Sequence, residues 1–225
     1  MSRRSEQASE ERRGRLTRAR VLDAAIDLAD REGIAAVSMR RLAQELGVEA
    51  MSLYTHVRSK DDLLDGMADA VVARVAPPVR PGAWLMTLRA TVLAARRELL
   101  RHPWSARVIE TRAAPGPATI AYMDRIARIL REGGFSADLA HHALHVLGSR
   151  VMGFSQDLFD DKAEVDPGEA AAFAEQLAGR YPNIAAIALA ASHEGGLGGC
   201  DDDIEFAFGL DLILEGLEAR RVATG

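Results

Sequence analysis

Two short helical patterns on either side of Gly47 constrain the fold more than any other feature of this chain. Residues 38–60 read SMRRLAQELGVEAMSLYTHVRSK. Leu42 and Leu46 recur at helical spacing before the glycine, and Leu53 and Val57 do so after it. Two helices joined by a tight glycine turn form a helix-turn-helix, whose second helix lies in the major groove of DNA. The stretch therefore predicts a DNA-reading element.

Short or flat hydrogen-bonding side chains gather on the second helix of this unit. They are Ser52, Tyr54, Thr55 and His56. Such groups suit phosphate oxygens and base edges. Arg40 and Lys60, each near the start of a neighbouring helix, could clamp phosphates where helix N-termini add backbone N–H donors. Each residue alone is equally typical of a solvated surface, but together and in this order they favour DNA reading.

The rest of the chain keeps the apolar spacing of helices and has no convincing alternating strand pattern, so we predict an all-α fold. Residues 1–15 are polar and rich in Arg and Glu, which predicts a mobile arm. A helix-turn-helix DNA-binding domain is expected over residues 16–76, ending before Pro77-Pro78. A larger helical domain for ligand binding and dimerisation is expected over residues 77–225. Thr17, Ser38, Ser59 and Ser136 are predicted helix N-caps.

Length and composition favour a soluble cytoplasmic protein. The chain has 225 residues with 48% apolar content, which suffices for a buried core. No apolar run approaches the roughly 18 to 20 residues needed to span a bilayer, and no apolar segment follows the basic start, so neither membrane insertion nor secretion is expected. The single Cys200 cannot form an intrachain disulfide, which fits a reducing compartment.

The net charge of -5 is unevenly divided along the chain. Residues 1–60 hold 12 Lys and Arg against 9 Asp and Glu, whereas residues 61–225 hold 16 against 24. The positive part coincides with the predicted DNA-reading unit. A mixed-charge surface produces such a mild asymmetry as well, so the segment charge adds little independent weight.

The final helix is expected to be apolar on nearly all sides. Three aspartates at 201–203 suit a helix N-terminus, and few polar positions follow before Leu217. A helix of this kind must be buried on most faces. A partner subunit supplies that burial readily at the end of a chain of this size, which favours a homodimer interface, with an internal core helix as the alternative.

No constellation in the sequence indicates catalysis. His141 and His145 share a helix face at a spacing that can bind metal, but no third ligand accompanies them, so surface or pocket-lining histidines are the simpler interpretation. The acidic stretches lack the ligand order of a calcium loop. No phosphate-binding glycine loop, nucleophile elbow or Cys-His arrangement is visible. We therefore predict neither an enzyme nor a cofactor or metal.

The residues over 16–75 resemble the DNA-binding region of bacterial one-component repressors of the TetR type. The positions that carry this resemblance are Gly33-Ile34, Leu42-Ala43, Leu46-Gly47-Val48, Leu53-Tyr54, His56-Val57 and Ser59-Lys60. The segments GGFSADLAHHALHVLGSRVMGF and FAFGLDLILEGLE are more loosely similar to helices of the tetracycline-repressor branch. The resemblance implies an all-helical homodimer whose small N-terminal domains bind a palindromic operator in double-stranded DNA. It also implies larger C-terminal domains with a ligand pocket and a four-helix dimer interface.

The resemblance assigns DNA contacts to eight residues. They are Arg40, Ala50, Met51, Ser52, Tyr54, Thr55, His56 and Lys60. Ala50 and Met51 replace a polar-then-proline pair of the tetracycline-repressor branch, so the operator sequence is not expected to carry over. Ser149 stands where a histidine of that branch would stand, and the histidine and asparagine pattern for tetracycline and magnesium is not recovered, so neither is predicted as ligand.

Helix faces suggest six residues for a ligand pocket, although core packing is an open alternative for each apolar one. They are Trp84, Leu88, Met123, His145, Ser149 and Met152. The function predicted from these features is a ligand-responsive transcriptional regulator, a repressor released from a palindromic operator by a small apolar effector. A helical small-molecule-binding protein or enzyme that retains a helix-turn-helix, and an activator of the same architecture, remain as alternatives.

Overall fold

The computed structural model describes residues 16–76, 83–153, 172, 175, 176, 178–191 and 201–224. The described residues form helices and connecting turns without a strand among them, which confirms the all-α prediction. The chain divides into two compact units, one up to Met152 and one from Gly153. Residues 1–15, predicted as an arm, lie outside the described ranges. Residues 77–82, which follow the predicted domain boundary, lie outside them as well, so both features stay predictions.

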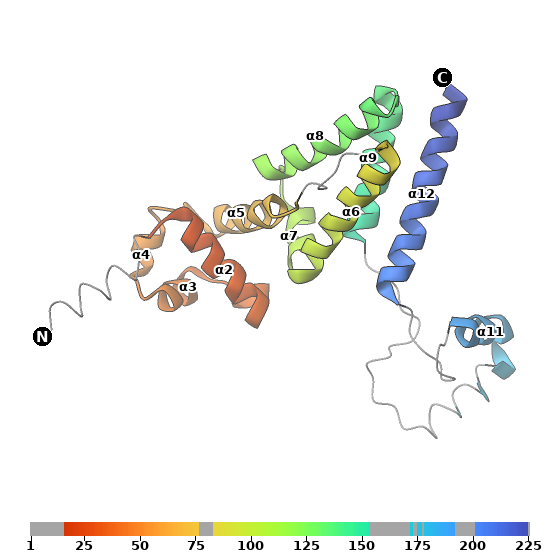
Figure 1. Cartoon of the computed structure of the whole chain (residues 1–225). Coiled ribbons are helices and arrows are strands. Elements are labelled where there is room, and N and C mark those ends of the chain that lie inside the picture. Colours follow the sequence, from red (N-terminus) through yellow and green to blue (C-terminus); the bar gives the residue numbers. More distant parts are fainter. Residues whose placement is uncertain are drawn as a thin grey trace, which may run out of the picture. The chain divides into compact units, whose positions relative to one another are not determined.

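The first helices of the chain surround one apolar core (Figure 1). They are α2 (Arg18–Glu32), the short 3-10 helix η1 (Ile34–Ala36), α3 (Met39–Leu46), α4 (Ala50–Leu53) and α5 (Lys60–Ala73). The fully buried side chains include Ile26, Leu28, Leu42, Leu53 and Leu63. The predicted caps hold: the side chains of Thr17, Ser38 and Ser59 each accept a backbone N–H from the first turn of the helix that follows.

The turn between α3 and α4 depends on Gly47. This glycine has φ 66° and ψ 37°, the left-handed conformation that ends a helix, and the Val48 N–H donates to the Ala43 carbonyl across it. The second helix is shorter than the sequence pattern predicted, because only Ala50–Leu53 is regular. The Thr55 hydroxyl donates to the Ser52 carbonyl at 2.7 Å, a local bond that competes with helix continuation.

The remaining helices of the first unit are α6 (Trp84–Arg101), α7 (Ser105–Thr111), α8 (Pro117–Glu132) and α9 (Ala137–Met152). Helix α5 contacts α2 as well as α6, α7 and α8, and therefore belongs to both groups of helices in this unit (Figure 1). Ser136 caps α9 by accepting the Leu139 N–H at 3.1 Å, as predicted. Helix α9 ends at Met152.

The second unit contains α11 (Pro182–Ala191) and α12 (Asp202–Thr224). The Asp201 carboxylate accepts the backbone N–H of Asp203 and Ile204, so the aspartate run starts α12 as predicted. Phe206, Leu210, Leu214 and Leu217 are buried, whereas Ile204, Phe208 and Leu212 are more than half exposed. Helix α12 is therefore apolar on a second face. None of the described helices has the length and apolar character needed to cross a membrane.

Candidate nucleic-acid interface and apolar cavity

The eight residues predicted to contact DNA lie on α3, on α4, in the turn after α4 and at the start of α5. Six are exposed: Arg40, Met51, Ser52, Tyr54, Thr55 and Lys60. Ala50 and His56 are half-buried. Met51 is 75% exposed, an unusual position for a large apolar side chain. The arrangement leaves polar groups and one apolar side chain available to a partner.

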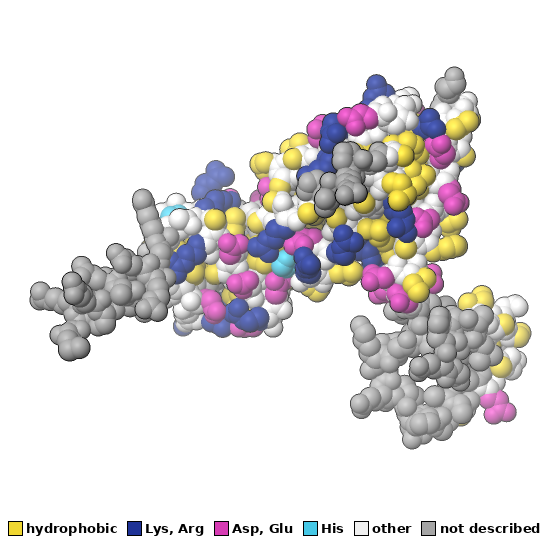
Figure 2. Space-filling view, viewed as in Figure 1, with side chains coloured by type: hydrophobic (Ala, Val, Ile, Leu, Met, Phe, Trp, Pro, Cys, Tyr) yellow, Lys and Arg dark blue, Asp and Glu magenta, His cyan; other side chains and the backbone are white. Residues whose placement is uncertain are grey.

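Most cations of residues 16–76 are committed to acidic partners within the protein. Arg41 pairs with Glu32 at 2.7 Å and with Glu45 at 3.3 Å, and Arg31 pairs with Glu45 at 2.7 Å. Figure 2 accordingly shows blue and magenta side chains intermixed over this region. Within residues 16–76, Arg40 and Lys60 are exposed and form no ion pair with any described residue. Their charges remain available for an external anion.

An arginine of α2 fixes the end of the reading element. Arg18 donates to the backbone carbonyl of His56 at 2.8 Å and to both carboxylate oxygens of Asp62 at 2.8 and 3.1 Å. Asp62 also accepts the Arg58 backbone N–H at 2.7 Å. The hydrogen bond from Arg18 is the main reason why the pKa of Asp62 lies below its ordinary value. Arg18 therefore joins α2, the reading element and α5.

A second polar network joins α2 to the turn between α6 and α7. The Asp30 carboxylate accepts the Trp104 indole N–H at 2.7 Å and lies 2.9 Å from Nδ1 of the buried His102. Arg74 Nη1 lies 3.3 Å from His102 Nε2, and Arg74 also donates to Asp23 at 2.9 Å. His102 Nδ1 therefore faces a carboxylate, which can only accept, whereas Nε2 lies near both the Arg74 guanidinium and Glu98 Oε1, the latter at 3.6 Å. The network ties the end of α5 to both groups of helices.

Helix α8 is capped by a carboxylate from another helix. Asp69, on α5, accepts the backbone N–H of Ala118 at 2.9 Å and of Thr119 at 3.0 Å. The local N-cap residue is Gly116, which has no side chain to supply this bond. A Cβ atom at Gly116 would lie 2.4 Å from Asp69 Oδ1, so glycine is what lets the carboxylate approach. The contact fixes the start of α8 against α5.

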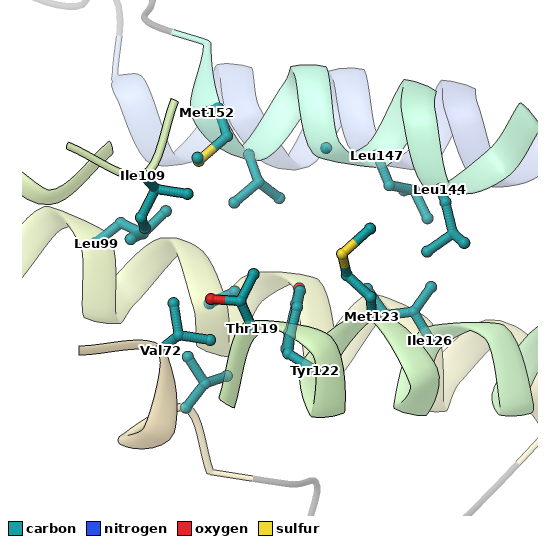
Figure 3. A pocket seen from close by; sticks show the side chains of 14 residues that line it. Val72, Leu99, Ile109, Thr119, Tyr122, Met123, Ile126, Leu144, Leu147 and Met152 are labelled. Carbon is teal, nitrogen blue, oxygen red and sulfur yellow. The ribbon is translucent and has the colours of Figure 1, made fainter. Parts of the chain in front are cut away.

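A cavity of about 200 Å³ lies between α5, α6, α7, α8 and α9 (Figure 3). Its lining residues are Val72, Val75, Ala95, Leu99, Ile109, Thr119, Tyr122, Met123, Ile126, Leu144, Leu147, Gly148, Val151 and Met152. None of these described residues is charged. The cavity suits an apolar small molecule, since such pockets are lined mainly by apolar groups with few polar ones.

Two of the six predicted pocket residues, Met123 and Met152, line this cavity. The structure places the other four elsewhere. Trp84 packs edge-on against Phe135 with ring centroids 4.7 Å apart, and Leu88 is buried outside the lining. His145 and Ser149 are exposed, and the Ser149 hydroxyl donates to the His145 carbonyl at 3.0 Å.

Asp69 and Tyr122 were not among the residues predicted from the sequence. Asp69 interrupts the apolar half of α5, where Ala68 and Val71 are buried, and an isolated acid at such a position indicates a specific partner. Tyr122 directly precedes Met123, which the helix-face argument did identify. The partner of Asp69 lies 49 and 50 residues away in sequence, so no local pattern identifies it.

The histidines of α9 do not form a metal site in the described structure. His141 and His145 stack edge-to-face with ring centroids 4.6 Å apart, and His142 lies 3.8 Å from Asp138. All three rings belong to exposed residues. Among the described residues, no group of three or more His, Cys, Asp or Glu side chains is placed to hold a metal ion.

Comparison with known proteins identifies both halves of the chain. Residues 21–67 match the family described as bacterial regulatory proteins, tetR family. Residues 76–221 match the family described as tetracyclin repressor-like, C-terminal domain. Together the two matches span most of the chain.

Individual relatives agree with this result. The chain is 33% identical over 205 residues to an HTH-type transcriptional regulator of Saccharopolyspora erythraea, covering 91% of this chain and 85% of the relative. It is 34% identical over 205 residues to the class A tetracycline repressor of transposon 1721 in Escherichia coli, covering 90% of each. The crystal structure of ActR from Streptomyces coelicolor in complex with (S)-DNPA superposes with a TM-score of 0.68 at 33% identity, covering 92% of this chain and 100% of ActR.

Proposed function

The chain belongs to the TetR family of bacterial transcriptional regulators, and from that premise we propose how its residues divide the work of a ligand-responsive repressor. The reading surface on α3, α4 and the start of α5 binds a palindromic operator. The cavity between α5 and α9 takes an apolar effector that weakens operator binding. The observation that carries the proposal is that one helix, α5, bears both Lys60, at the reading surface, and Val72, in the cavity wall.

The DNA contacts divide by chemistry. Arg40 and Lys60 are assigned to phosphates, because they are exposed cations with no ion pair among the described residues. Ser52, Tyr54 and Thr55 are assigned to phosphates and base edges. Met51 offers a flexible apolar side chain, which suits apolar contact with a thymine methyl group. Ala50 and His56 complete the assigned surface.

The dimer is assigned to the exposed apolar face of α12. Ile204, Phe208 and Leu212 follow one another at four-residue spacing and are 58, 61 and 54% exposed. Three such side chains in a row on one helix face are typical of an association surface. A twofold dimer would present two reading elements about 34 to 36 Å apart, the spacing of successive major grooves.

The effector acts through linkage. A molecule that binds more tightly to the conformation unfit for DNA lowers operator affinity, and the operator lowers effector affinity by the same factor. Couplings of this kind are typically about 1 to 3 kcal/mol, or roughly 5- to 150-fold. ActR binds (S)-DNPA in the related crystal structure, which supports a small-molecule effector for this chain. We place the protein in the cytoplasm and assign it binding without catalysis.

The test begins with selection of genomic DNA fragments that the purified protein retains, followed by gel-shift titrations on the selected operator. Tyr54→Ala and Lys60→Ala should each lower the affinity for the operator. Lys60→Ala should also make the slope of log K against log salt concentration less negative, by about 0.9 per lost phosphate contact. Arg128→Ala is the matched control, because it removes an exposed cation of α8. Unchanged affinity in both reading-surface variants would refute the assignment.

Sedimentation tests the dimer separately. Phe208→Asp, at a 61% exposed position, should convert a dimer at micromolar concentration into a monomer. A wild-type protein that already sediments as a monomer would contradict the assigned interface.

A further inference from the structure

The cavity lining contains few polar groups, and these differ in whether they have hydrogen-bond partners. The described lining residues carry only two side-chain hydroxyl groups, those of Thr119 and Tyr122. The Thr119 hydroxyl lies 3.4 Å from the Asp69 carboxylate, which already binds the Thr119 backbone N–H. The Tyr122 hydroxyl is buried and has no hydrogen-bond partner. Tyr122 is therefore the only lining side chain, among those described, with an unused polar group.

The state of the Tyr122 hydroxyl follows from its surroundings. Burial raises the pKa of Tyr122 to about 12, although Arg125 partly opposes the change, so the phenol stays protonated near neutral pH. A protonated phenol can donate one hydrogen bond. Leaving that donor buried without an acceptor costs free energy, and native structures generally satisfy such groups with a water or a ligand. Figure 3 shows Tyr122 on α8 among the side chains that line the cavity.

The size and charge of the cavity limit what can supply the acceptor. An engineered cavity of about 150 Å³ holds benzene, so the present cavity of about 200 Å³ has room for roughly two fused rings. The described lining has no cation to compensate an anionic ligand, and Arg125 Nη1 donates instead to the Val75 carbonyl at 3.3 Å. An uncompensated carboxylate in this lining would lose its hydration without replacement.

On the premise that the cavity is the effector site, we propose that the effector is a neutral, mainly apolar molecule of about two fused rings. A carbonyl or ether oxygen of this molecule accepts the hydrogen bond of Tyr122. The rings contact the methionine and aliphatic side chains of α8 and α9. Tyr122 thereby distinguishes an oxygen-bearing ligand from the corresponding hydrocarbon.

The experiment compares three probes with the full-length protein in the absence of DNA, by isothermal titration calorimetry. The probes are 1-tetralone, tetralin and 2-naphthoate, which supply a neutral acceptor, no acceptor and a negative charge. The wild type should bind 1-tetralone about threefold to tenfold more tightly than tetralin, the range of one net hydrogen bond. In Tyr122→Phe this preference should vanish while tetralin affinity stays unchanged. Binding of 2-naphthoate should be the weakest.

Two further variants locate the effect. Tyr122→Phe removes a hydroxyl that has no partner, so its melting temperature should not fall below that of the wild type. A Cβ atom at Gly148 would meet no other atom within 4 Å, so Gly148→Leu should fill the cavity and abolish binding of both neutral probes. Equal 1-tetralone affinity in the wild type and Tyr122→Phe would overturn the proposal. Failure of 1-tetralone to bind at its solubility limit, or tighter binding of 2-naphthoate, would overturn it as well.

Operator release is measured in a separate titration, so that the two proposals fail independently. A 1-tetralone preference that depends on Tyr122 but leaves operator affinity unchanged would uphold the ligand chemistry and refute the assignment of this cavity as the effector site. Operator release by other molecules, with no Tyr122-dependent preference, would uphold the repressor and refute the ligand chemistry.

Discussion

Replacing Asp69 with alanine should destabilise the protein by removing the cap of α8. The carboxylate binds the backbone N–H of Ala118 at 2.9 Å and of Thr119 at 3.0 Å, and both N–H groups lie in the first turn of α8, where they have no acceptor within the helix. Gly116, at the N-cap position, has no side chain to take over. The cap therefore depends on one residue of α5.

The size of the effect follows from these contacts. Loss of an N-cap acceptor costs about 0.5 to 2 kcal/mol, and loss of a negative charge at a helix N-terminus costs about 0.3 to 1 kcal/mol. We therefore expect Asp69→Ala to lower the free energy of unfolding by about 2 kcal/mol. For a chain of 225 residues, each kcal/mol shifts the melting temperature by about 2 to 4 °C, so the expected decrease is roughly 4 to 8 °C.

Thermal unfolding followed by circular dichroism, at one fixed protein concentration, measures this decrease. Asp69→Asn should retain part of the stability, because its amide oxygen can still accept one N–H. Gly116→Ala is an independent way to disturb the same contact. Its backbone φ of -74° suits alanine, but the new Cβ atom would lie 2.4 Å from Asp69 Oδ1 and displace the carboxylate.

Since both changes act on one contact, the double variant should lose less than the summed losses of the single variants. A melting temperature of Asp69→Ala within 1 °C of the wild type, or full additivity in the double variant, would show that the cap is not what holds α8.

Three further predictions concern residues 16–76. Asp62→Asn should be less stable than the wild type at neutral pH. Because Arg18 lowers the folded-state pKa of Asp62, the stability difference between wild type and variant should shrink as the pH falls below about 4. Thermal melting measured over a series of acidic pH values tests this. Gly47→Ala should cost about 1 kcal/mol in urea unfolding because of its left-handed backbone, and Gly47→Asn should cost less. Asp30→Ala leaves His102 Nδ1 and the Trp104 indole N–H without their acceptor and should lower the free energy of unfolding in urea by about 2 kcal/mol. The control Asp27→Ala, at an exposed position, should change it by no more than about 0.5 kcal/mol. Equal losses in the two variants would argue against the network.

Local features of the fold were predictable from the sequence because their physical cause is local. A serine or threonine before an apolar helical pattern caps that helix within three residues, and Thr17, Ser38, Ser59 and Ser136 all do so. The Gly47 turn follows from the same kind of short-range preference. The early end of α4 was missed because the Thr55 hydroxyl competes for a carbonyl of the same turn, and a periodic apolar pattern does not register this competition.

The cavity wall could be predicted only in part because a helix face has to be known to within one residue. In α9 the lining residues Leu144, Leu147, Gly148 and Val151 follow the spacing of a single stripe. His145 and Ser149 each come one position later, which rotates them by about 100° toward solvent. The histidine and the serine were predicted because their side chains are polar, whereas the residues that line the cavity are their neighbours Leu144 and Gly148.

The position of Asp69 on α5 connects the two halves of the proposed mechanism. The wall residue Val72 follows Asp69 by three residues, and Lys60 lies nine residues before Asp69. At about 1.5 Å per residue, roughly 14 Å of helix separates Asp69 from Lys60. A tilt of α5 of about 5° at Asp69 would move Lys60 by roughly 1 Å.

Arg18 would pass such a movement to the reading element, because it binds Asp62 and the His56 carbonyl together. An effector wedged against Val72 can bias this tilt only if it binds one position of α5 more tightly than the other. In the proposed mechanism the Asp69 cap is one of the contacts that oppose the tilt, beside the pairing of Arg112 with Asp65 at 3.2 Å, so it would limit how much of the effector's binding free energy reaches the DNA. Weakening the cap should therefore reduce stability and change the effector concentration needed for operator release, whereas a purely structural cap would change stability alone.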